Sequence, residues 1–78
     1  KNIYSYLVEK KNYAVLSILL DRMEIIEPNE ARWYAQNAMA RYLLGDTMRA
    51  LAEIKKAMEL DNSYKAEGEN FIKTIEEK

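Results

Sequence analysis

The sequence predicts a small all-α domain, and three observations support this. The chain has 78 residues, which is enough for a single domain. It contains only two glycines and one proline, too few for the frequent turns of an all-β fold. Hydrophobic residues make up 49% of the chain and charged residues 32%, a balance typical of folded rather than disordered proteins. We therefore expect one all-α domain over residues 1–78, built from five short helices.

Four short segments divide the chain into these helices, because each combines a helix end with a possible helix start. They are residues 10–12, 27–29, 45–46 and 61–63. Gly45 is expected to adopt the left-handed conformation that ends a helix, and Asp46 to cap the next one. Pro28 cannot continue a helix, which leaves Asn29 to begin another. Connections this short make neighbouring helices antiparallel.

The first expected helix, up to residue 10, is hydrophobic from its start, and the chain begins at Lys1 without methionine. Both features suggest a fragment of a longer protein. The second helix, residues 12–26, is apolar nearly all round. Leu16 and Leu20 lie on one side of it, and Val15, Leu19 and Ile26 lie on another. We expect this helix to be buried from two sides.

The later helices carry narrower apolar stripes. In residues 46–60, apolar side chains recur at steps of three and four, with Ala50 and Ala57 as small residues that let helices approach closely. The last helix, about residues 63–77, places Phe71 and Ile72 on one stripe, and its other positions are mostly charged. Its outer face is therefore expected to be solvated.

A helix pair recurs along the chain. The turns at residues 27–29 and 61–63 lie thirty-four residues apart, and so do Leu20 and Ile54. A rival alignment, one residue longer, pairs residues 23–25 with residues 58–60. The period is therefore that of a helical repeat, and both alignments of the two helix pairs remain open.

On these residues the chain resembles the tetratricopeptide repeat family. Residues 31–64 carry most of the family signature: Tyr34 or Trp33 at the aromatic position, Ala38 at the small position, Gly45 and Asp46 in the turn, Ala50 and Ala57 on the second helix, Ile54 for phenylalanine and Asn62 for the closing proline. The resemblance implies an α-α superhelix of antiparallel hairpins. It divides the chain into a degenerate repeat over 1–30, a repeat over 31–64 and a capping helix over 63–78.

Two polar residues depart from the family pattern. Asn37 and Arg41 stand where the family has leucine and tyrosine. Either the helix is rotated so that Tyr42 and Met39 are buried instead, or the two polar side chains find partners inside the domain.

The composition excludes most catalytic and metal sites. The chain has no cysteine and no histidine, so it has no thiolate nucleophile, no imidazole base and neither of the usual zinc ligands. Two glycines cannot form a phosphate-binding loop. Carboxylates gather at Glu24, Glu27 and Glu30 and again near the C-terminus, but we expect solvated helix faces there. No stretch has the ligand spacing of a calcium loop. We expect no enzyme activity, cofactor or metal.

Nucleic acid and membrane are also unexpected partners. The formal charge is -1, with twelve basic and thirteen acidic side chains, whereas binding to phosphate backbones requires a basic surplus. No apolar run approaches the roughly 20 residues that span a bilayer. The compartment cannot be read from these residues, and the cytoplasm is only the default expectation.

The family resemblance implies a non-enzymatic adaptor that binds a peptide or partner helix in a concave groove. The residues that would line this groove are Ser5, Val8, Arg32, Ala35, Gln36, Met39, Tyr42 and Leu43. One alternative is self-association through Val15, Leu19 and Ile26, which would make the domain a homo-oligomerisation unit. Another is an accessory domain of a larger enzyme or complex.

Overall fold

The structure is a computed structural model that describes residues 12–77. These residues form α2 (Tyr13–Ile26), α3 (Ala31–Leu43), α4 (Thr47–Leu60), the single 3₁₀ turn η1 (Asn62–Tyr64) and α5 (Lys65–Glu76). The all-α class is confirmed, but the described part of the chain contains four α-helices rather than five. The first expected helix falls in residues 1–11, outside the described residues.

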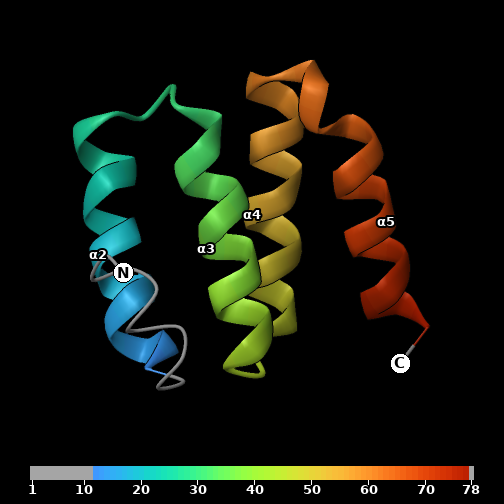
Figure 1. The fold of residues 1–78 in the computed structure, drawn as a ribbon, viewed down its shortest axis with the longest axis horizontal. Coiled ribbons are helices and arrows are strands. Elements are labelled where there is room, and N and C mark those ends of the chain that lie inside the picture. Colours follow the sequence, from blue (N-terminus) through green and yellow to red (C-terminus); the bar gives the residue numbers. More distant parts are fainter. Residues whose placement is uncertain (1–11, 78) are drawn as a thin grey trace, which may run out of the picture.

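Helix α3 lies between α2 and α4, and α5 packs on the other side of α4 (Figure 1). Successive helices run in opposite directions, as the short connections require (Figure 1). The four helices pack compactly, and over residues 12–77 neither a superhelix nor a repeated unit is established.

The joint between α3 and α4 follows the sequence prediction. Gly45 has φ of +88°, in the left-handed region that favours glycine. Its N–H donates to the Tyr42 carbonyl, and the Asp46 N–H donates to the Arg41 carbonyl, so these two carbonyls at the end of α3 have donors. The Asp46 side chain then accepts a hydrogen bond from the Arg49 N–H at 3.2 Å and caps α4.

The joint between α2 and α3 differs from the prediction. Glu30, not Asn29, is the N-cap of α3, and its side chain makes no capping hydrogen bond. Aromatic side chains hold this turn instead. Trp33 Nε1 donates to Glu27 Oε1 at 2.7 Å, and the Tyr34 hydroxyl donates to the Pro28 carbonyl at 2.8 Å. These two hydrogen bonds, from side chains in the first turn of α3, replace the expected polar cap.

Two apolar clusters form the core, one on each side of α3. The cluster toward α4 and α5 contains Ala31, Ala38, Ile54 and Ala57, with Tyr34, Ala35, Met58, Leu60, Tyr64, Phe71 and Ile72 packed around it. The cluster toward α2 contains Leu16, Leu20 and Ala40, with Trp33 packed against it. Small residues dominate the first cluster, and Ala50 and Ala57 are completely buried. The helices therefore approach closely, as the alanine positions predict.

Helix α2 is buried on one side only within residues 12–77. Leu16 and Leu20 face α3, whereas Val15, Leu19 and Ile26 are 42%, 48% and 68% exposed. The expected burial from two sides is thus not found among the described residues. None of the helices described is long and apolar enough to cross a membrane.

Candidate functional site

Six of the eight predicted partner-binding residues lie on one face of α3. Arg32, Met39 and Leu43 are exposed, and Ala35, Gln36 and Tyr42 are half-buried. The spacing of three and four residues aligns them along the helix. Ser5 and Val8 lie outside the described residues. The structure therefore brings together the six positions that it describes.

This face of α3 borders α5. The Tyr42 ring meets the Phe71 ring edge to face, with 5.6 Å between the ring centres and an angle of 72° between the planes. Ala35 packs against the apolar cluster to which Phe71 also belongs. Met39 and Leu43 remain 48% and 46% exposed. The result is an apolar strip beside the contact of α3 with α5.

Arg32 does not extend freely from this face. Its guanidinium lies over the Trp33 ring, 4.7 Å from the ring centre. This cation-π contact gives the guanidinium a preferred position, and its N–H groups can act as hydrogen-bond donors there.

The least expected feature of the interior is a group of polar side chains between the helices. Asn37 of α3 is completely buried, and its Nδ2 points at carboxylates from both neighbouring helices. It donates to Asp21 Oδ1 at 2.7 Å and to Glu24 Oε2 at 2.9 Å, and Glu53 Oε2 lies 3.4 Å away. One turn later, Arg41 donates to Asp21 Oδ2 at 2.6 Å. A polar layer thus separates the two apolar clusters at α3.

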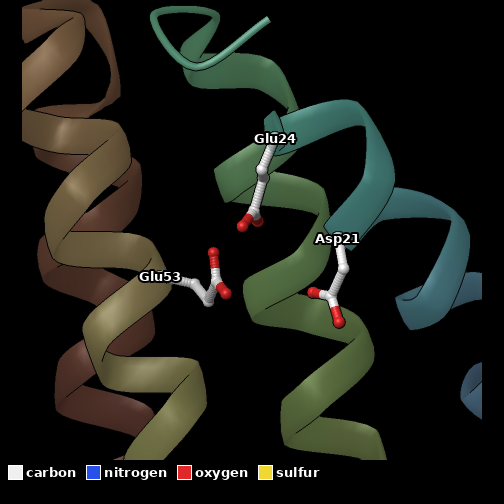
Figure 2. Close-up of side chains that lie close together, drawn as sticks. All are labelled: Asp21, Glu24 and Glu53. Carbon is white, nitrogen blue, oxygen red and sulfur yellow. The ribbon is translucent and has the colours of Figure 1, made fainter. Parts of the chain in front are cut away.

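The three carboxylates of this layer turn toward one another (Figure 2). One oxygen from each of Asp21, Glu24 and Glu53 lies within 4.8 Å of the other two. We call Asp21, Glu24, Glu53 and Asn37 the interhelical polar cluster. Its Asn37 Oδ1 and Glu53 Oε1 atoms are buried and have no hydrogen-bond partner within residues 12–77. The cluster therefore retains acceptor capacity that the described residues do not use.

This environment shifts the acidity of two side chains. Glu53 is only 8% exposed, and its pKa is raised to about 8. Burial is the main cause, followed by the hydrogen bond with Glu24 and the negative charges of Glu24 and Asp21, while Arg49 opposes the rise. The pKa of Tyr34 is also raised, first by desolvation and then by the charges of Glu24 and Glu53.

The cluster decides between the two alternatives for Asn37 and Arg41, and it contradicts the prediction for Glu24. Asn37 and Arg41 do find partners inside the domain, and Met39 stays exposed. Glu24 was expected on a solvated face with Glu27 and Glu30, but it turns inward toward Asn37 while Glu27 stays exposed. Asp21 and Glu24 lie three residues apart on α2, and Asn37 and Arg41 lie four residues apart on α3. The similar spacing of these two polar pairs was the sequence signal that could have predicted their contact.

Glu53 was missed altogether by the sequence analysis. It lies between Ala50 and Ile54 on the buried side of α4. A lone acidic residue inside an apolar stripe was the available signal, because ionised carboxylates are rarely buried without partners.

Comparison of the chain with family models, curated proteins and solved structures found no match.

Proposed function

We propose that this chain is a non-enzymatic protein-interaction module that binds an apolar peptide or partner helix along α3. The observation that carries this proposal is the strip beside α5, where Met39 and Leu43 expose nearly half of their surface. Exposed apolar side chains grouped next to an aromatic contact are typical of protein-binding surfaces.

The chemistry of the strip favours an apolar ligand with a few polar contacts. Met39 can adapt its shape to different side chains, and Leu43 contributes apolar area. Gln36 can both donate and accept a backbone hydrogen bond, and Arg32 adds a directional donor. With one cation and no carboxylate among these positions, the strip favours neither a strongly acidic nor a strongly basic partner.

The tetratricopeptide-like interpretation is part of this proposal. Buried alanines at positions 38, 50 and 57 and the left-handed Gly45 are compatible with closely packed antiparallel hairpins. In that arrangement α3 and α5 would line the inner surface that receives the ligand.

The test is a peptide selection followed by mapping of the site. Peptides would be selected from a random library displayed on phage, and the tightest would be titrated into ¹⁵N-labelled protein. We expect amide shifts at Arg32, Gln36, Met39 and Leu43, and at least tenfold weaker binding after Met39→Lys, since burying an unpaired charge is costly. The matched control is Met48→Lys, an exposed methionine on α4. Shifts elsewhere, or equal effects of the two variants, would refute the α3 site.

A second candidate is self-association through α2. Val15, Ile18, Leu19, Ile25 and Ile26 are 42% to 79% exposed, and their spacing places them along one face of the helix. A symmetric dimer could bury this face in both copies. Sedimentation equilibrium tests it: a dimer that becomes monomeric after Leu19→Lys, with helicity retained, supports it. A monomer at every accessible concentration contradicts it.

A further inference from the structure

We propose that the interhelical polar cluster binds a hard divalent cation of the Ca²⁺ type. Its ligands are the carboxylates of Asp21, Glu24 and Glu53, with the side-chain carbonyl of Asn37 as a fourth oxygen. This site is independent of the α3 strip and of any protein partner.

The carboxylate geometry fits one ion. Oxygens bound to the same Ca²⁺ lie 2.3–2.6 Å from it, so two of them are at most about 5 Å apart. The three carboxylate oxygens of the cluster lie within 4.8 Å of one another and point inward from α2 and α4 (Figure 2). Asn37 Nδ2 now lies 2.7, 2.9 and 3.4 Å from oxygens of these three carboxylates, so a cation bound between them takes over the contacts of that nitrogen.

The charge of the cluster also fits. Without a cation, Glu53 keeps its proton at neutral pH, so Asp21 and Glu24 carry the negative charges, and Arg41 balances one of them through its ion pair with Asp21. A divalent cation releases the Glu53 proton to solvent and neutralises the carboxylates of Glu24 and Glu53, whereas the neutral amide of Asn37 only donates hydrogen bonds.

Asn37 gives the independent indication of a ligand. Its side chain is completely buried and directed into the cluster, yet its Oδ1 has no partner within the described residues. A half-turn of the amide exchanges Oδ1 and Nδ2 without changing the volume of the side chain. In the present orientation Nδ2 lies among the carboxylates, and in the reversed orientation Oδ1 lies there. Four oxygens around one point repel one another unless a cation lies between them.

The exchange gives up the three contacts that Nδ2 makes with the carboxylates, so it is expected only when a cation is bound. The buried Oε1 of Glu53, which also has no partner, provides a further free ligand atom for bidentate binding. All candidate ligands are hard oxygens, which favours Ca²⁺ over Zn²⁺ or copper. The Asp21 side chain is 37% exposed and provides the approach from solvent, where water completes the coordination.

The test uses the chain as it is, with CaCl₂ as the probe. Isothermal titration calorimetry is expected to give one site per chain, with a Kd on the order of 10⁻⁵ to 10⁻³ M, as for calcium sites with few charged ligands. The thermal midpoint is expected to rise by several degrees at saturating Ca²⁺. In ¹⁵N spectra the side-chain NH₂ signals of Asn37 must shift, because the amide turns.

Two ligand variants and one control test whether Ca²⁺ binds at the interhelical polar cluster. Glu53→Gln and Glu24→Gln each remove one charged ligand at constant volume, and each is expected to weaken Ca²⁺ binding at least tenfold. Glu59→Gln makes the same change at an exposed position of α4 and must leave binding unchanged. Having two ligand variants keeps the test valid if one of them fails to fold. The proposal is overturned if Ca²⁺ up to about 10 mM moves neither the thermal midpoint nor the Asn37 signals, well above the weakest calcium sites. It is equally overturned if all three variants bind alike.

Discussion

The side-chain amide of Asn37 donates a 2.7 Å hydrogen bond to the Asp21 carboxylate, which lies sixteen residues earlier on α2. The same amide nitrogen also donates to Glu24 at 2.9 Å. A completely buried residue of α3 thus ties α2 into the domain through polar contacts rather than through apolar packing alone. Because a buried amide N–H without an acceptor is unfavourable, these bonds specify how α2 packs against α3.

Replacement of Asn37 by leucine is expected to destabilise the domain by about 2–4 kcal/mol. Leucine has a similar volume, so packing is retained, but the carboxylates of Asp21 and Glu24 lose their common donor. Urea denaturation followed by circular dichroism measures the change. Asn70→Leu is the control, because Asn70 is exposed on α5, and it is expected to change stability by less than about 0.5 kcal/mol. A similar loss in both variants would contradict the role given to Asn37.

Stability is expected to fall as the pH rises from about 4.5 toward 8. The pKa of Glu53 is raised from 4.5 to about 8 in the folded chain, so between these values the folded state holds a proton that the unfolded state has released. This stabilisation is complete below pH 4.5 and is lost as the pH passes through the folded pKa. Since one pKa unit corresponds to about 1.4 kcal/mol, the full effect is on the order of several kcal/mol.

The Glu53→Gln variant isolates this effect. Glutamine resembles the protonated acid and does not titrate, so the free energy of unfolding of the variant should change much less between pH 5 and pH 9 than that of the natural chain. Urea denaturation at three pH values provides the comparison, with Glu59→Gln as the exposed control on the same helix. Parallel pH profiles for the natural chain and Glu53→Gln would exclude Glu53 as the titrating group.

The helices themselves could be predicted because their signals are local. Gly45 and Asp46 end one helix and cap the next within two residues, and the structure has both features. The stripe that includes Ala50, Ile54 and Ala57 likewise identified the buried side of α4. The cap expected at Asn29 was wrong, since Trp33 and Tyr34 hold that turn from inside α3 through contacts six residues back.

The interhelical polar cluster could be predicted only in part, because it depends on contacts between helices. Asn37 and Arg41 were recognisable as polar residues at apolar positions, and partners for them were one of two alternatives. Their partners lie thirteen to twenty residues away, a separation that no periodicity within one helix encodes. Glu53, equally polar, was missed because its burial follows from the packing of α4 on α3.

Gly45→Ala is expected to destabilise the domain by about 1–2 kcal/mol. Gly45 has φ of +88°, and an alanine there pays the penalty of the left-handed conformation even though the space around its Cβ is open. The effect is therefore one of backbone conformation, so Gly45→Asn, which tolerates this region better, should lose less stability than Gly45→Ala. Thermal unfolding of the two variants measures the difference. Equal losses would indicate a steric cause instead.

Ala50→Leu is expected to destabilise the domain by about 1–3 kcal/mol. Ala50 is completely buried on the side of α4 that packs against the other helices, so three additional carbon atoms would force those helices apart. Lys56→Ala on the same helix is the control. Lys56 is exposed and alanine is a good helix former, so this change should be nearly neutral. Chemical denaturation of both variants compares the free energies of unfolding. If Ala50→Leu proves as stable as Lys56→Ala, the close approach of the helices at this position is wrong.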